Sequence, residues 1–330
     1  MEMISLKPQI RVSDMIKNVG FEGFLLVKTA QQKTSMNGSK YLDMTLTDTS
    51  GEINAKKWDA QELPPKVGEV IKVRGMVQEY NNRLQLRVDK MRLSEQTDEV
   101  DMNELIPCAE RPPEEMLEEI INRTDAMENH QLRDLILKMI DDAGDRLTLM
   151  PAAKNLHHAQ RSGLLNHTTK MLEGAEYMCK LYPFLDYDLL SAGVIVHDLC
   201  KIEEMQCDEL GIVTDYTVEG NLLGHIVMGI SKLDRFGREL NMDHELLIML
   251  EHMVLAHHDL PEYGSPKQPM FPEAEVLHIL DLLDARMFEM KAECEKVKPG
   301  CFTERIWSLD RKLYRRSSAE DKDASAEAGN

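Results

Sequence analysis

Residues 191–201 read Ser-Ala-Gly-Val-Ile-Val-His-Asp-Leu-Cys-Lys, and this stretch decides how the larger part of the chain is interpreted. The apolar run from Leu189 to Val196 ends directly in the pair His197-Asp198. A carboxylate at the end of a buried apolar run is costly to desolvate unless it is paired or coordinated. The stretch therefore indicates either a buried metal site or a core histidine beside a helix-capping aspartate.

Further histidine and acidic residues recur outward from this pair at regular intervals. Gaps of 30, 28, 32 and 24 residues separate His167, His197, His225, His257 and Asp281, and His258 follows His257 directly. Each gap fits one helix and its connection, so we expect each side chain to enter a shared bundle interior from its own helix. Imidazole and carboxylate suit Mn, Fe, Co and Zn ions. The spacing predicts a site for one or two divalent ions, in which Asp198 can bridge both.

Other polar residues near this set allow two interpretations each. Lys201 shares a helix face with Asp198 and either contacts a phosphate or forms a salt bridge with Glu203 or Glu204. Glu219 is a candidate for orienting a ligand histidine. His157 and His158 either line a substrate channel or cap a helix. Lys267, in the proline-rich loop 259–272, either meets RNA phosphate or belongs to a rigid connector.

Composition excludes several protein classes. The 330 residues are 42% apolar and 29% charged, which is typical of a globular protein of about two domains. The longest apolar run is far shorter than the roughly 20 residues of a membrane span, so we expect no membrane association. The start of the chain shows no apolar signal segment. The six cysteines form no Cys-x-x-Cys pair, which favours a reducing cytoplasm over a disulfide scaffold.

The N-terminal part has a different pattern from the rest. Residues 12–34, 41–48, 52–58, 70–77 and 83–88 alternate or cluster apolar residues as strands do, with an interruption after the third. Five short strands with that interruption predict an OB-fold barrel. From residue 114 the periodicity becomes helical and continues to about residue 316. We therefore expect an α+β protein: an OB-fold barrel at 1–95, a linker at 96–113, an all-α domain at 114–316 and a disordered tail at 317–330.

Charge divides the chain in the same way. Residues 1–95 hold 15 Lys and Arg against 12 Asp and Glu, whereas the whole chain has a net charge of −19. OB folds hold single strands with aromatic platforms and basic residues. The candidates for base stacking are Phe24, Tyr41, Trp58 and Tyr80, although some of these rings must instead fill the barrel. The candidates for phosphate contact are Lys28, Lys57 and Arg83. Backbone contacts carry no sequence information, so weak base preference is expected.

Several strings bring these observations to a resemblance. His167…His197-Asp198…Asp281 resembles the signature of HD-domain metal-dependent phosphohydrolases, and Ser162-Gly-Leu-Leu-Asn-His-Thr, Ala192-Gly-Val-Ile-Val-His-Asp-Leu-Cys-Lys and Leu255-Ala-His-His-Asp are similar to the YhaM family of 3′–5′ exoribonucleases. The resemblance covers the N-terminal barrel as well as residues 150–310.

The resemblance implies both an activity and a ligand set. It implies hydrolysis of single-stranded RNA, or DNA, from the 3′ end to 5′-mononucleotides, with Mn²⁺ as the first choice of ion. His167, His197, Asp198 and Asp281 match the core ligands, His225, His257 and His258 match those of a second ion, and Lys201 matches a phosphate-contacting lysine. Asp284 stays open as an alternative to Asp281. Two other functions remain as alternatives: a phosphohydrolase of small or cyclic nucleotides with a regulatory OB domain, and a non-catalytic RNA-binding protein with a structural metal. The oligomeric state is left open.

Overall fold

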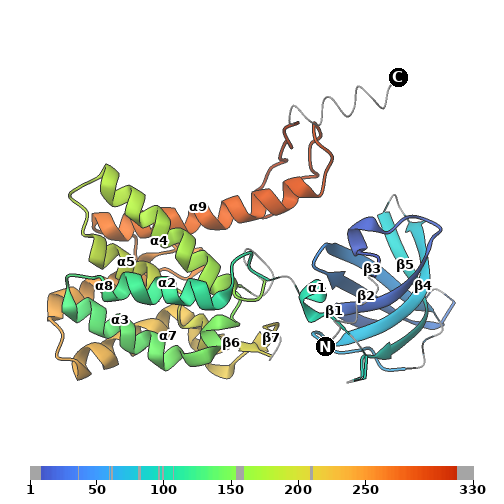
Figure 1. Ribbon diagram of the computed structural model, residues 1–330, viewed down its shortest axis with the longest axis horizontal. Helices are drawn as coiled ribbons and strands as arrows, with labels where there is room; N and C mark the ends of the chain where they lie inside the picture. Colours follow the sequence, from blue (N-terminus) through green and yellow to red (C-terminus); the bar gives the residue numbers. More distant parts are fainter. Residues whose placement is uncertain are drawn as a thin grey trace, which may run out of the picture. The chain divides into compact units, whose positions relative to one another are not determined.

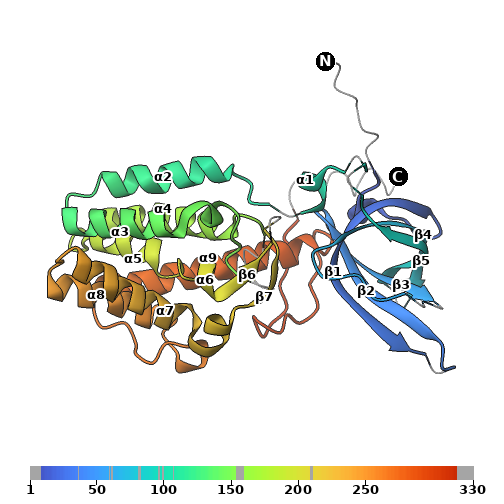
Figure 2. The ribbon, with the colours of Figure 1, turned by 90° about the horizontal axis from the view of Figure 1, so that it is seen from below.

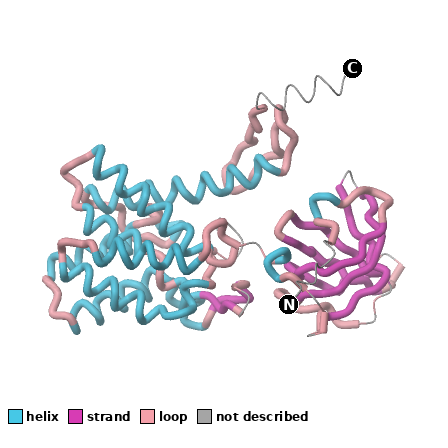
Figure 3. Tube along the Cα trace, viewed as in Figure 1, coloured by secondary structure: helices cyan, strands magenta, loops and turns pink. Residues whose placement is uncertain are grey.

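The computed structural model describes residues 9–317, apart from 36, 59, 61, 81–82, 96, 99, 107, 154–159 and 209–210. The chain forms two compact units. One contains the chain up to Glu110 together with Cys207–Thr214, and the other contains Arg111–Gln206 and the residues from Asp215 onward. Strands dominate the first unit and helices the second (Figure 3). Residues 318–330 of the predicted tail and the pair His157-His158 lie outside the described residues.

The first unit is built on a closed five-stranded barrel. Its strands are β1 (Gly20–Thr34), β2 (Lys40–Asp48), β3 (Gly51–Trp58), β4 (Val70–Tyr80) and β5 (Arg83–Leu93). They are hydrogen-bonded in the order β1-β2-β3-β5-β4, and β4 returns to β1 (Figure 1). The β3–β5 pair is parallel and the other pairs are antiparallel. The prediction of a five-stranded OB-fold barrel is confirmed, although residues 12–14 form a short 3₁₀ helix, η1 (Val12–Asp14), instead of the start of a strand.

Alternation along the strands gives the barrel two distinct faces. In β2, Leu42 and Met44 are buried in the interior, whereas Tyr41 and Asp43 between them face outward. Because side chains alternate with period two, the outward residues of neighbouring strands share one surface. This outer surface of β2, β3 and β5 is where the nucleic-acid candidates must be sought.

The segment expected as a linker is partly packed onto the barrel. It contains α1 (Met102–Leu105), and Leu105 and Ile106 are buried against Leu26 and Val70. The apolar residues within this otherwise acidic stretch explain the difference, because they cover an apolar patch on the outside of the barrel.

The second unit is a helical bundle (Figure 2). Its helices are α2 (Pro113–Asp125), α3 (His130–Ala143), η2 (Gly144–Thr148), α4 (Gly163–Leu181), α5 (Tyr187–Val196), α6 (Lys201–Glu204), α7 (Val218–Glu239), α8 (His244–Ala256), η3 (Pro261–Tyr263) and α9 (Pro272–Glu295). A hairpin of β6 (Met205–Cys207) and β7 (Val213–Tyr216) was not expected within residues 114–316, and its residues from Cys207 to Thr214 belong to the first unit. Within the described ranges, no helix combines the length and apolar character that a membrane span requires.

The helical pattern ends earlier than predicted. Helix α9 stops at Glu295, and bridges between Phe302 and Tyr314 and between Ile306 and Arg311 join the following chain into a hairpin. The expectation of helix to about residue 316 was therefore wrong. Pro299-Gly300 provides the physical reason, since proline cannot continue a helix and Gly300 adopts a positive φ of 80°.

Candidate metal centre and nucleic-acid face

The bundle brings all seven predicted ligand candidates into two neighbouring groups. Asp198, His225, His257 and His258 form one group, and His167, His197 and Asp281 form the other; in each, the possible ligand atoms all lie within 4.8 Å of one another. They come from α4, the ends of α5 and α8, the kink of α7, and α9. The spacing of one helix per ligand therefore predicted the convergence correctly.

Two of the histidines are oriented by the ends of their own helices. His197 and His257 are the C-cap residues of α5 and α8, and their Nδ1 atoms lie 2.8 Å from the carbonyl oxygens of Val194 and Val254. A carbonyl oxygen only accepts, so Nδ1 must carry the proton in both rings. The Nε2 atom of each ring then presents a lone pair, which is the form that binds a metal.

His225 is oriented by a carboxylate that the sequence analysis considered only as a partner of Lys201. Glu204 accepts hydrogen bonds from the backbone N–H of His225 at 3.1 Å and from its Nδ1 at 3.1 Å. Helix α7 is kinked just before this point, at Gly224, whose φ of 73° and ψ of 161° are accessible essentially to glycine alone. Glu219 does not take the predicted role: it is exposed in the first turn of α7.

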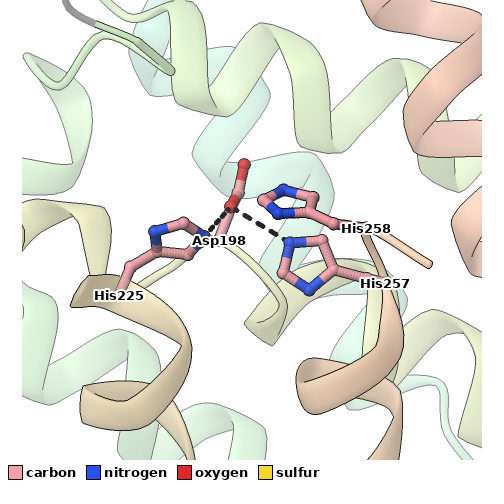
Figure 4. Close-up of side chains that lie close together, drawn as sticks. All are labelled: Asp198, His225, His257 and His258. Atoms are coloured by element: carbon pink, nitrogen blue, oxygen red, sulfur yellow. Dashed lines mark ion pairs between the residues drawn. The ribbon is translucent and has the colours of Figure 1, made fainter. Parts of the chain in front are cut away.

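Asp198 lies at the centre of the site. Its Oδ1 is 3.2 Å from Nε2 of His225 and 3.8 Å from Nε2 of His257, and Figure 4 shows the two rings converging on that oxygen from different helices. Its Oδ2 is 3.5 Å from Nε2 of His197, in the other group. One carboxylate thus faces both groups, as a bridging ligand would.

Lys201 forms its salt bridge with Asp198 and not with the glutamates considered from the sequence. Its Nζ donates to Oδ2 of Asp198 at 2.6 Å, and both side chains are buried. Burial alone would lower the pKa of Lys201, but Asp198 raises it above the ordinary value. For Asp198, burial would raise the pKa, and Lys201 and the surrounding imidazoles hold it well below the ordinary range. The pair is therefore charged at neutral pH.

Asp281 and Asp284 take different positions around His167. Asp281 Oδ1 is 3.3 Å from Nε2 of His167, on the side of the metal-ligand group, whereas Asp284 Oδ2 is 2.7 Å from Nδ1 on the opposite side of the ring. Burial would lower the pKa of His167, but the two carboxylates raise it to about 9. This arrangement supports Asp281 as the ligand and Asp284 as the residue that orients the ring.

The unsatisfied polar atoms of this cluster fit a divalent ion. Nε2 of His197, His225 and His257 and Oδ1 of Asp198 are buried, and none has a hydrogen-bond partner within the described part of the chain. An unpaired buried polar atom costs about 1–3 kcal/mol. Burial and the neighbouring imidazoles keep the pKa of His257 well below its ordinary value, so this ring is neutral and ready to coordinate. The donor set fits one or two ions of the Mn, Fe, Co or Zn class.

The barrel's outer face gathers three of the predicted aromatic residues around one lysine. Tyr41 and Trp58 are stacked with ring centroids 4.7 Å apart, and Nζ of Lys56 lies 5.5–5.9 Å from the ring centroids of Tyr41, Trp58 and Tyr80. Trp58 and Tyr80 are 47% and 62% exposed. Arg83 lines a hollow of about 610 Å³ beside them, together with Tyr80 and Lys56. Exposed rings beside basic residues are a surface suited to unpaired bases.

The other predicted contacts lie elsewhere. Phe24 packs against the cluster that holds Leu105 and carries Lys72 over its ring. Lys57 is paired with Glu62, and Lys28 with Glu52. Lys267 is exposed in the loop before α9. None of these four side chains joins the cluster of Tyr41, Trp58, Tyr80 and Lys56.

Comparison with known proteins agrees with both parts of the structure. Residues 24–94 match the OB-fold nucleic acid binding domain and residues 164–286 match the HD domain. A further model, described as that of a helicase, matches residues 108–185.

Two curated relatives match almost the whole chain. The 3′-5′ exoribonuclease YhaM of Oceanobacillus iheyensis is 37% identical, with 92% of this chain and 96% of the relative covered. That of Bacillus licheniformis is 38% identical, with 88% and 93% covered. Among solved structures, the second OB-fold domain of replication protein A from Methanococcus maripaludis is 22% identical over 28% of this chain and all of that domain, with a TM-score of 0.23.

Proposed function

The chain belongs to the YhaM family of 3′–5′ exoribonucleases, and on this premise we propose how its residues degrade single-stranded RNA from the 3′ end to 5′-mononucleotides. The observation that carries the proposal is the set of buried, unsatisfied ligand atoms around Asp198. A merely structural metal site is closed and needs about four ligands. Seven candidates in two groups are more than such a site requires, and they favour a catalytic centre.

Two divalent ions are the proposed cofactors, with Mn²⁺ as the first choice. His167, His197 and Asp281 would hold one ion, His225, His257 and His258 the other, and Asp198 would contribute to both. Bound there, the ions would supply a water of lowered pKa and polarise the scissile phosphate. The protein orients the rings of His167, His197, His225 and His257 in advance through their Nδ1 contacts, so little reorganisation of these rings accompanies binding.

Lys201 is proposed to contact the phosphate. Its ammonium is held by Asp198 inside the site and is charged at neutral pH. A fixed positive charge at this position stabilises the negative charge that develops on the phosphate oxygens during hydrolysis. Asp198 would thereby both bind the ions and hold this cation in place.

The barrel is proposed to hold the RNA single strand. Tyr41, Trp58 and Tyr80 would stack unpaired bases, and Lys56 and Arg83 would face the backbone. Phe24, Lys28, Lys57 and Lys267 remain candidates for weaker contacts outside this cluster. We also place the protein in the cytoplasm, because its six cysteines are all free thiols, which fits a reducing compartment.

The test is a 5′-labelled RNA that carries a single-stranded 3′ overhang on a hairpin. With Mn²⁺ present, products should shorten stepwise from the 3′ side and pause near the stem, because a duplex end lacks the unpaired bases that the barrel stacks. A panel of cyclic and mononucleotides serves as the control for a small-molecule phosphohydrolase. Internal cuts, products released first from the 5′ end, or full activity in excess chelator would refute the proposal.

A further inference from the structure

A chain of hydrogen-bonded polar side chains crosses four strands on the outer face of the barrel. Lys33 of β1 donates to Oδ2 of Asp43 on β2 at 2.6 Å. Nδ2 of Asn54, on β3, donates to Oδ1 of Asp43 at 2.9 Å, and Nε2 of Gln85, on β5, donates to Oδ1 of Asn54 at 2.6 Å. We call Lys33, Asp43, Asn54 and Gln85 the polar ladder.

The ladder fixes which way the two amides point. Burial would raise the pKa of Asp43, but hydrogen bonds from Lys33 and Asn54 lower it below the ordinary value, so Asp43 is ionised and only accepts. The amide nitrogen of Asn54 also donates to the carbonyl of Met44 at 3.1 Å. With both donors of Asn54 used, its oxygen must face Gln85, and the nitrogen of Gln85 must be the donor.

Gln85 therefore presents a defined pair of groups to its surroundings. Its carbonyl oxygen and its second N–H form no hydrogen bond with any residue that the structure describes. Gln85 lines the hollow of about 610 Å³ together with Tyr80 and Arg83. Lys56, which lines the same hollow, has its ammonium over the three aromatic rings. An oriented acceptor and donor thus stand beside a stacking platform.

We propose that Gln85 reads the N7 edge of one unpaired base and favours adenine, an inference that rests on the proposed binding of single-stranded RNA. A glutamine amide pairs bidentately with adenine, accepting from its 6-amino group and donating to a ring nitrogen. Guanine presents two acceptors at the corresponding edge, which suits arginine or lysine better. Phosphate contacts alone predict that RNA affinity depends little on base sequence. The polar ladder adds a preference for one base at one position.

The experiment measures binding of the full-length protein, in EDTA so that RNA is not consumed. The probes are fluorescein-labelled 12-nucleotide RNAs of adenosine, uridine and inosine, followed by anisotropy. Inosine keeps the purine ring but lacks the 6-amino group, so it separates hydrogen bonding from stacking. One bidentate base contact is worth about 1–3 kcal/mol, so adenosine RNA should bind at least about fivefold more tightly than inosine RNA.

Two glutamine variants test the assignment. Gln85→Leu should bring the adenosine and inosine affinities within about twofold of each other and leave uridine binding nearly unchanged. Gln78→Leu is the matched control, because Gln78 is the register partner of Gln85 on β4 and is not part of the ladder; it should keep the preference. Equal affinities of the unmodified protein for adenosine and inosine RNA would overturn the proposal. So would an adenosine preference that survives in Gln85→Leu, or a loss of affinity for all three RNAs in that variant.

The proposed function can be judged separately on the same RNAs. Suppose that Mn²⁺ supports stepwise shortening of adenosine and uridine RNA from the 3′ end, while the affinities for adenosine and inosine RNA are equal. Only the adenine assignment then fails. If no RNA is shortened from its 3′ end, the exoribonuclease proposal fails whatever the affinities are.

Discussion

At the scale of single residues, we expect the Lys201–Asp198 salt bridge to affect both activity and stability. Asp198→Ala should reduce RNA hydrolysis to background, because it removes the carboxylate that faces both ligand groups. It should also lower the free energy of unfolding by about 3–5 kcal/mol in EDTA, because the Lys201 ammonium is then buried without a partner. Urea titration measures this loss.

A double variant separates the two effects. Asp198→Ala combined with Lys201→Met removes the uncompensated charge and should recover most of the stability without any activity. A double variant as unstable as the single one would show that the cost does not come from the buried ammonium.

Glu204 leads to a second prediction at this scale. Glu204→Gln should weaken metal binding about 10–100-fold at the group containing His225, the range typical of residues that orient a ligand. Metal analysis of the dialysed protein should then fall from two ions per chain to one. Asp284→Asn is the corresponding variant in the other group, because it removes the carboxylate that contacts Nδ1 of His167. It should instead weaken metal binding at the group containing His167. Two retained ions in Glu204→Gln would contradict the role given to this residue.

Sequence spacing predicted the ligand candidates but not the groups that orient them. His167, His197, His225, His257 and Asp281 recur one helix apart, and helix geometry brings such residues together. Glu204 could not be found this way, because its contact with His225 depends on the kink at Gly224 and on a short helix that ends in a hairpin. Asp281 and Asp284 share a helix face, and only the structure separates the two sides of the His167 ring.

At the scale of elements, the kink in α7 predicts that a change in the backbone at Gly224 alters metal binding at His225. Gly224→Ala places a side chain at φ 73° and ψ 161°, which should cost about 1–3 kcal/mol and displace His225. Gly144→Ala is the control, because Gly144 has a similar backbone conformation of φ 59° and ψ −156° with open space around it. Both variants should lose similar stability by urea titration, and only Gly224→Ala should weaken Mn²⁺ binding in calorimetry. Equal Mn²⁺ affinity in the two variants would contradict the role of the kink.

The strands were easier to predict than the last helix. Alternation with period two in residues 41–48 and 83–88 directly reflects the two faces of a barrel, so β2 was found close to its observed bounds and β5 at its first residue, although β5 continues to Leu93. Residues 296–316 contain enough apolar side chains to suggest a helix, and the hairpin there depends on pairing between Phe302 and Tyr314, which periodicity does not report.

At the scale of the whole molecule, RNA binding and chemistry should be separable. The double variant Trp58→Ala and Tyr80→Ala should weaken binding of single-stranded RNA at least about tenfold, since stacking contributes about 1–3 kcal/mol per base. Hydrolysis of a small activated phosphodiester should be unchanged, because the ligand groups lie in the helical unit. Trp307→Ala, at a tryptophan that is 94% exposed outside the barrel, should leave both measurements unaffected. Unaltered RNA affinity in the double variant would exclude this face as the binding surface.

Because the ligand candidates are spread along the chain, metal ions bound by them would cross-link distant segments. The candidates extend from His167 on α4 to Asp281 on α9, so the helical unit cannot unfold without releasing the ions. Ligands that bind only the folded state add to its stability, by about 2.7 kcal/mol at a free concentration one hundred times the dissociation constant. Scarcity of the ion would then lower the melting temperature as well as the turnover rate. A cell short of metal would lose this enzyme to proteases, so its abundance would follow the metal supply.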